Sequence, residues 1–270
     1  MIRGLYTAAS GLVAGLRQQE LVANNIANIS TPGYRGESSA MSSFERVLAV
    51  RVGNAPLPVP LTFRRQLGVV GTGAYMAQRT SYLAEGGLRL TDAPLDIAIR
   101  GDGFFAVQGP TGTLYTRNGH FSSMDGQLVT AAGFAVLGSD DQPIVIDDGK
   151  QIVVSTQGGI FTIESVVNDA SGELEQVRVQ VGELQIVHIP AEVLVRAGDT
   201  SFVPAPGNTP VAVGDETVVV QGALEESNVD ITRAATQLSR LSQQFSANQR
   251  VFATLDESLE QAVRDIGRVG

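Results

Sequence analysis

Few side chains in this sequence are suited to catalysis or metal binding. Cysteine is absent, and the two histidines, His120 and His188, lie far apart in the chain. A zinc site would need these histidines close to carboxylates, and a catalytic triad would need a serine and an aspartate arranged around one of them. His120 follows a predicted turn and His188 lies in an alternating strand pattern, and neither is part of such a motif. We therefore predict that both histidines are structural.

Two other motifs have the composition of ligand sites. Gly101-Asp102-Gly103 has the glycine spacing of a phosphate-binding loop, but Phe104-Phe105 continues a strand where that loop needs a helix. The acid pairs Asp140-Asp141 and Asp147-Asp148 fit solvated turns and lack the twelve-residue pattern of a calcium loop. The sequence thus predicts no catalytic residue, no cofactor and no metal, and we predict that the protein is not an enzyme.

The bulk composition narrows the possible partners. The chain has 270 residues, of which 43% are hydrophobic, and its formal net charge is −9. An acidic chain without a basic cluster is repelled by nucleic acid and by anionic membranes. We find no apolar run of membrane-spanning length, so we predict no direct membrane insertion. The N-terminus lacks a continuous apolar core, which favours an amphipathic helix over a cleaved signal peptide.

Both ends of the chain carry an apolar stripe at alternating spacings of four and three residues. This is the repeat of a coiled coil. It predicts helices over residues 4–28 and 231–266 that pair as a coiled-coil-like stalk. The stripe positions are Leu5, Ala9, Leu12, Leu16, Gln19, Ala23 and Ile26 in the first helix, and Ile231, Ala234, Leu238, Leu241, Phe245, Asn248, Phe252, Leu255, Leu259, Ala262 and Ile266 in the second.

Each stripe contains a polar residue, Gln19 in the first and Asn248 in the second. If the helices are antiparallel with Leu5 near Ala262, Gln19 lies opposite Asn248. We hypothesise that the two amides then hydrogen-bond and fix the register of the helices. The equally weighted alternative is that both side chains face solvent or another subunit.

The pattern in the middle of the chain predicts β structure. Together with the terminal helices, this predicts an α+β fold with a central all-β domain of antiparallel strands. Strands are predicted near residues 95–99, 104–107, 144–146, 152–155, 160–163, 177–181, 184–189 and 217–221. Asn118-Gly119 and Asp125-Gly126 are predicted hairpin turns. The predicted organisation is a helical terminal domain (1–36 plus 222–270), an extended linker (37–70) and a β-rich outer domain (71–221).

The linker prediction rests mainly on three prolines. Pro56, Pro58 and Pro60 alternate with apolar residues, which favours an extended chain. Residues 41–52 before them are compatible with either a short helix or a strand.

The end of the first helix is the most specific local signal. Three amides, Asn24, Asn25 and Asn28, precede the turn sequence Ser30-Thr31-Pro32-Gly33. Asparagine is a poor residue for a helix interior, so these amides are expected to cap the backbone or bridge to neighbouring subunits. The alternative is a frayed helix end with ordinary amides.

This stretch, from Asn24 to Arg35, resembles the signature of the flagellar basal-body rod protein family. Further stretches resemble the same family in the same order along the chain. They are Gly71-Thr72-Gly73, the run from Gly87 to Phe105, the hairpins of residues 115–121 and 125–138, and the run from Gly222 to Asp230. With one compact β domain, the chain is most similar to the proximal and distal rod proteins within this family.

The resemblance implies a structural subunit that polymerises into the hollow drive shaft between the flagellar motor and hook. It implies self-assembly, contacts with other flagellar rod and hook proteins, and passage through the flagellar export apparatus. It also implies a place in the basal body outside the cytoplasm, in the periplasm, with no cleaved signal peptide. The implied assembly interface comprises Leu5, Ala9, Leu12, Leu16, Gln19, Ala23, Asn24, Asn25, Ile26, Asn28, Pro32, Gly33, Tyr34, Ile231, Leu238, Leu241, Phe245, Asn248, Phe252 and Leu255.

Two alternatives remain open on the sequence. One is a hook or hook-junction axial protein, which the single β domain disfavours. The other is a secreted β-rich binding module or enzyme that oligomerises through its helical ends, which the scarcity of histidine and cysteine disfavours.

Overall fold

A computed structural model describes residues 2–44, 46–54, 62–71, 73–147, 150–167, 174–214 and 217–267. The chain divides into two compact units. Unit 1 comprises Met1–Ile26, Glu37–Thr80 and Ile231–Gly270, and unit 2 comprises Ala27–Gly36 and Ser81–Asp230. This division differs from the predicted one, because residues 27–36 and 222–230 group with the β structure and residues 37–80 group with the helices.

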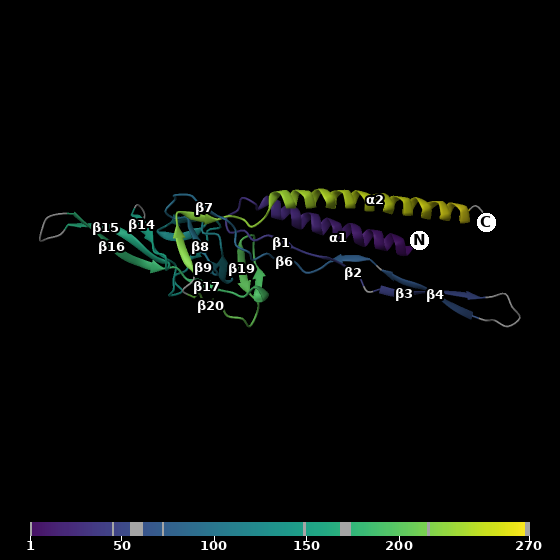
Figure 1. Cartoon of the computed structure of the whole chain (residues 1–270), viewed down its shortest axis with the longest axis horizontal. Coiled ribbons are helices and arrows are strands. Elements are labelled where there is room, and N and C mark those ends of the chain that lie inside the picture. The colour runs from purple at the N-terminus through teal and green to yellow at the C-terminus, as the bar shows by residue number, and fades with distance from the viewer. Residues whose placement is uncertain are drawn as a thin grey trace. The chain divides into compact units, whose positions relative to one another are not determined.

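Unit 1 contains both predicted helices, α1 (Ile2–Ala27) and α2 (Ile231–Gly267). They run antiparallel, with the N- and C-termini at the same end of the pair (Figure 1). Their contacts fix the alignment: a β-carbon added to Gly4 would lie 3.5 Å from Cδ1 of Leu255, and one added to Gly11 would lie 3.6 Å from Nδ2 of Asn248. Gly4 and Gly11 of α1 therefore face the apolar stripe of α2.

The middle segment of unit 1, Glu37–Thr80, forms strands, where the sequence predicted an extended linker over residues 37–70. Its strands pair as β1 with β6, β2 with β5 and β3 with β4, and the last two pairs are antiparallel. Valines are frequent in β3, and β-branched residues favour a pleated, paired strand. The alternating prolines at 56, 58 and 60 lie outside the described residues. The bounds are β1 (Glu37–Ser38), β2 (Met41–Ser43), β3 (Arg46–Asn54), β4 (Thr62–Gly71), β5 (Ala74–Met76) and β6 (Thr80–Ser81).

Unit 2 is built around a sheet that has nine strands in the described residues. Its main path runs β11-β12-β13-β9-β10-β19-β18, and β17 joins β20 to β9. The pairings are antiparallel, as the sequence predicted. The strands are β9 (Phe104–Gly109), β10 (Gly112–Thr116), β11 (Phe121–Met124), β12 (Gln127–Thr130), β13 (Ala135–Val136), β17 (Ile186–His188), β18 (Leu194–Arg196), β19 (Ser201–Pro204) and β20 (Val211–Ala212), and a short 3-10 helix, η1 (Ala191–Val193), precedes β18.

Smaller antiparallel sheets complete unit 2. β14, β15 and β16 form a three-stranded sheet, β8 pairs with β21, and β7 pairs with β22. The pair of β7 and β22 joins the entry of the chain into the unit to its exit. The bounds are β7 (Leu88–Leu90), β8 (Ile97–Arg100), β14 (Gln151–Val154), β15 (Gly159–Val167), β16 (Leu174–Glu183), β21 (Val218–Gln221) and β22 (Ala223–Glu225).

The two predicted hairpin turns have different outcomes. Asp125-Gly126 connects β11 to β12 with φ values of 51° and 74°, which confirms the prediction. The prediction for Asn118-Gly119 is wrong, because β10 pairs with β9 and β19 and not with β11. Gly119 instead packs against another strand: a β-carbon there would lie 1.6 Å from the carbonyl oxygen of Ile97. The glycine is needed for this close approach of two backbones.

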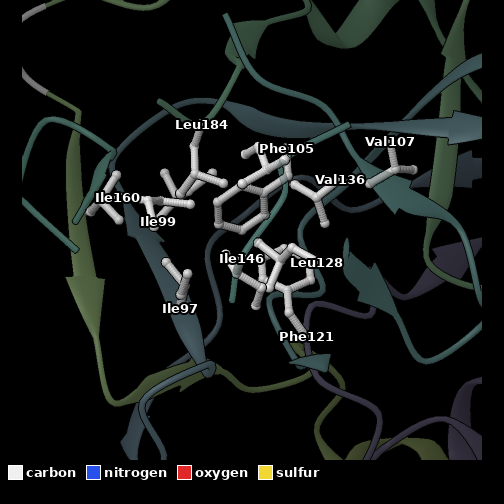
Figure 2. Packing of buried hydrophobic residues seen from close by; sticks show 12 residues of the cluster. Ile97, Ile99, Phe105, Val107, Phe121, Leu128, Val136, Ile146, Ile160 and Leu184 are labelled. Carbon is white, nitrogen blue, oxygen red and sulfur yellow. The ribbon is translucent and has the colours of Figure 1, made fainter. Parts of the chain in front are cut away.

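The hydrophobic core of unit 2 lies between the large sheet and the smaller ones. It contains Phe105 and Phe121, whose ring centroids are 5.2 Å apart in an edge-to-face arrangement. Each fully buried side chain of this size stabilises the fold by about 1.5–3 kcal/mol. Figure 2 shows how residues from strands and from the connections between them converge in this core, namely Ile97, Ile99, Phe105, Val107, Phe121, Leu128, Val136, Ile146, Ile160 and Leu184.

Candidate assembly surface

The turn after α1 is fixed by its own backbone. The amide of Thr31 donates to the carbonyl of Asn28 at 3.2 Å, and the amide of Tyr34 donates to the carbonyl of Thr31 at 3.3 Å. Gly33 has a φ of 66°, which favours glycine. Pro32 is half-buried, whereas Gly33 and Tyr34 are buried. These turn residues of the predicted interface are therefore largely covered within unit 2.

The three amides at the end of α1 have distinct environments. Asn25 is buried and bonds β1 in both directions: its Nδ2 donates to the carbonyl of Glu37 at 2.7 Å, and its Oδ1 accepts the amide of Glu37 at 2.9 Å. The side chain of Asn28 accepts the hydroxyl of Thr31 at 3.2 Å. Asn24 is exposed. The side chain of Asn25 thus hydrogen-bonds to nearby backbone, which is one of the two predicted roles, and that of Asn28 bonds to the turn residue Thr31.

A buried ion network anchors the turn. Nη2 of Arg35 lies 2.7 Å from Oε1 of Glu225, and Nη1 of Arg117 lies 3.3 Å from Oε2 of the same carboxylate. These side chains are at most 3% exposed. Arg117 also donates to the carbonyls of Ile99 and Gly101. Burial lowers the pKa of Arg35, and the Glu225 carboxylate opposes that shift.

Two further side chains hold the backbone of the same turn. Asn228 accepts the amide of Gly36 at 2.8 Å and donates to the carbonyls of Tyr82 and Ala84 at 2.9 Å each. Arg196 donates to the carbonyl of Arg35. Its guanidinium lies 5.0 Å from the ring centroid of Tyr34 and 5.2 Å from that of Phe202, at cation–π distances.

The apolar stripe of α2 is the face that unit 1 covers. Ala234 and Leu241 are buried, and the remaining described stripe residues from Leu238 to Ala262 are half-buried. Ile231 is the exception, since it is 57% exposed. Of the interface residues predicted on α2, the half-buried ones are Leu238, Phe245, Asn248, Phe252 and Leu255.

The stripe of α1 is covered less uniformly. Leu5, Ala9, Leu12, Gln19 and Ile26 are half-buried, whereas Leu16 and Ala23 are exposed.

The most buried residues of α1 lie on a second face, which the sequence prediction missed: they are Ala14, Leu21, Val22 and Asn25. This face carries hydrogen bonds to the Glu37–Thr80 segment of unit 1. Ser10 accepts the amide of Ala74 at 3.2 Å, and Gln18 donates to the carbonyl of Ser39 at 3.3 Å. Reading residues 37–70 as a linker left this face without an expected partner. Helix α1 thus carries two covered faces.

The proposed pairing of Gln19 with Asn248 is wrong. Asn248 lies at the level of Gly11, and Leu255 lies at the level of Gly4. In this register Leu5 is far from Ala262, and Gln19 lies level with residue 240 of α2. The heptad pattern of α2 coincides with its covered face, but a shift of about two turns leaves the same pattern in contact, so the pattern cannot set the register.

Several large apolar side chains of the helices are exposed. They include Tyr6, Val13 and Leu16 on α1, which are 71%, 51% and 43% exposed, and Val251 and Val263 on α2, which are 53% and 69% exposed. Apolar side chains gathered on one helix suggest a surface that is covered in an assembly. These residues lie outside the predicted stripes, except Leu16.

The histidines and the glycine motif that we considered as possible catalytic or ligand-binding residues lie in different parts of unit 2. Nδ1 of His120 lies 2.7 Å from Oδ1 of Asp96, while His188 lies half-buried in β17. Within the described residues, no three His, Cys, Asp or Glu side chains form a metal-binding group. Gly101 and Gly103 form the turn between β8 and β9, and no helix follows it. Phe104 and Phe105 that follow are buried, as predicted, whereas β8 and β9 do not pair with each other.

No described helix is both long enough and apolar enough to span a membrane.

Comparison with known proteins gives matches along the whole chain. Three family models match: "Flagella basal body rod protein" over residues 5–35, "Flagellar hook protein FlgE/F/G D1 domain" over residues 98–162 and "Flagellar basal body rod FlgEFG protein C-terminal" over residues 220–265. Among similar proteins, the flagellar hook-basal body complex protein FlhO of Bacillus subtilis is 32% identical, with both chains covered in full.

Two further relatives are similar over nearly their whole length. The flagellar basal-body rod protein FlgG of Agrobacterium fabrum is 31% identical, with 95% of this chain and 96% of the relative covered. The flagellar basal-body rod protein FlgF of Escherichia coli is 30% identical, with 97% of each covered.

Proposed function

Because this chain belongs to the flagellar basal-body rod protein family and is a structural rod subunit in flagellar motility, we propose that α1 and α2 form the inner layer of the hollow shaft. The observation that carries this proposal is the set of exposed apolar side chains on both helices, such as Val13 and Val251. Contacts of one subunit face with a different face of the next do not close a dimer, and they generate a helical array.

In this proposal the paired helices make a coiled-coil-like stalk in the assembled shaft, and unit 2 forms the outer layer. Two of the glycines in α1, Gly11 and Gly15, permit close approach of neighbouring helices and also weaken the helix in isolation. The terminal helices then become fully ordered only beside other subunits. The proposed assembly residues are those of the predicted set that are not buried within the subunit, with Tyr6, Val13, Val251 and Val263 added.

The partners in this proposal are further copies of the chain, other rod and hook proteins, and the flagellar export apparatus. The subunit passes through that apparatus as an unfolded chain and assembles in the periplasmic part of the basal body.

The test is deletion of the gene, followed by electron microscopy of basal bodies and a motility assay. We expect incomplete rods, absent hooks and loss of swimming, all restored by the wild-type gene. Intact rods with hooks in the deletion strain would overturn the proposal.

A surface variant makes the test specific for the helices. Val13→Glu with Leu16→Glu places charges on exposed positions of α1, so the isolated chain should still fold. We expect this variant to be produced but to fail to restore rods. The matched control is Met124→Glu, since Met124 is 58% exposed on β11 of unit 2. Restoration of motility by the α1 variant would contradict a role for this helix face.

A further inference from the structure

Three segments that are distant in the sequence meet around Glu225. The backbone amide of Gly33 donates to the Glu225 carbonyl at 2.8 Å. The amide of Gly86 donates to Oε1 of the Glu225 side chain at 2.9 Å. The amide of Glu226 donates to the carbonyl of Gly87 at 2.7 Å. A single residue near the exit of unit 2 thus holds both the turn after α1 and the loop before β7.

The charges of this cluster depend on the same residue. Arg35 and Arg117 are two buried cations, and in the described part of the chain both form their ion pairs with Glu225. Glu85 attracts Arg35 more weakly. Arg35 also donates to the carbonyl of Ala84, in the loop that Gly86 belongs to. Removing the carboxylate would leave two buried guanidinium groups without their counter-charge, one of the most costly defects in a folded protein.

Asn228 connects the same three segments independently of charge. Asn228 lies in the segment where the chain leaves unit 2. Its side chain forms hydrogen bonds with Gly36 in the turn and with Tyr82 and Ala84 in the loop. Its amide also donates to the carbonyl of Tyr34 at 3.3 Å. Each segment is therefore held by the other two through both the ion network and an amide.

We propose that residues 33–36, 84–87 and 225–228 form one latch that opens and closes as a unit. Residues 33–36 of the latch directly precede β1, and residues 225–228 lie shortly before α2. The chain leaves unit 2 at these two places. Because the turn near the N-terminus is held by Glu225 and Asn228, it cannot close until the last part of unit 2 has folded against it. Opening of the latch frees both exits together while the core around Phe105 stays folded.

Native-state hydrogen exchange of the isolated full-length chain tests the latch. We expect the amides of Gly33, Gly36, Gly86 and Glu226 to exchange through one opening, with a common protection factor below that of the core amide of Leu137, which donates to the carbonyl of Ala106 at 2.9 Å. The proposal would be overturned if the four amides had different protection factors, or if their protection equalled that of the core.

Two substitutions sharpen the result. In Glu225→Gln we expect protection of the latch amides to fall together by about a hundredfold or more. The matched control is Glu226→Gln, because Glu226 is 54% exposed and pairs only at 3.5 Å with Arg89, so protection should change by less than about fivefold. Equal effects of the two substitutions would contradict the latch.

The second substitution keeps the proposal testable if Glu225→Gln does not fold. Asn228→Ala removes bonds to Gly36, Tyr82 and Ala84 but none to the amides of Gly33 or Gly86. We expect those two amides to lose protection by the same factor as Gly36, whereas Asn208→Ala, which removes a single bond to the carbonyl of Ala205, leaves them unchanged. Loss confined to Gly36 would overturn the proposal. These measurements use the isolated chain, so their outcome is separate from any effect on rod assembly.

Discussion

A β-carbon on Gly11 would lie 3.6 Å from Nδ2 of Asn248, so these two residues lie at the same level of the antiparallel helices. Gly4 and Leu255, one heptad further toward the termini, repeat the relationship at 3.5 Å. The polar residue in the α2 stripe thus faces a position of α1 without a side chain, which leaves room for its amide.

This register can be tested by crosslinking, because the chain contains no cysteine. We expect Gly4→Cys with Leu255→Cys to be joined within one chain by a short thiol-specific crosslinker. The control pair, Leu5→Cys with Ala262→Cys, is offset by about 12 Å along the helix axis at 1.5 Å per residue and should not react. Mass spectrometry after proteolysis measures both, and the reverse outcome would restore the register predicted from the sequence.

Replacing Gly15 by alanine should stabilise α1. A β-carbon at this position would meet no atom within 4 Å, so the substitution removes the flexibility of glycine without a clash. We expect a gain of about 0.5–1 kcal/mol in helix stability, seen as higher helical circular dichroism in a urea titration. Gly214→Ala is the control, since Gly214 is also in open space but lies outside the helices. An equal gain in both would rule out a helix effect.

Gly33 should tolerate no side chain. Its φ is positive, and a β-carbon would lie 2.4 Å from backbone atoms of Arg117 and Asn118. Gly207 also has a positive φ but has no atom within 4 Å of the added carbon. We expect Gly207→Ala to cost about 1 kcal/mol of unfolding free energy through backbone strain alone, and Gly33→Ala to cost about 3 kcal/mol or more. Similar midpoints in urea denaturation would contradict the close packing at Gly33.

Tyr115 should ionise at higher pH than an unperturbed tyrosine. Burial raises its pKa, and the negative charge of Asp141 adds to the shift. The unfolded chain therefore loses this proton first as the pH rises above about 10, so the stability due to neutral Tyr115 is intact below that pH and declines above it. The difference in phenolate absorbance between the wild type and Tyr115→Phe measures the titration. Asp141→Asn should move it to lower pH, and an unshifted Tyr115 signal would contradict this prediction.

The sequence predicted both helices and the antiparallel β structure of unit 2, but it predicted neither the strands in residues 37–71 nor the contacts between distant elements. The heptads of α2 identified its covered face from Ala234 to Ala262, because that spacing places the apolar side chains on one side of a helix. The second covered face of α1, with Ala14, Leu21 and Val22, was missed because it packs against strands in a segment interpreted as a linker.

At the turn after α1, the sequence likewise revealed the local pattern but not the contacts with distant segments. Arg35 and Glu225 both lie in stretches that resembled the family, yet their ion pair was not predicted. The sequence shows a buried charge only when the residue that pairs with it is known. Glu225 pairs with both Arg35 and Arg117, and Arg117 lies in a third stretch, after β10. Asn118-Gly119 has the composition of a hairpin turn, but contact with Ile97 and not local turn chemistry explains its glycine. Sequence patterns report local geometry, and contacts between distant segments lie outside them.

The chain passes between the two units four times, at 26/27, 36/37, 80/81 and 230/231. Neither unit is therefore encoded by an uninterrupted stretch of the gene. A single contiguous exchange can therefore transfer neither unit whole: a segment of residues 81–230 would leave residues 27–36 of unit 2 behind.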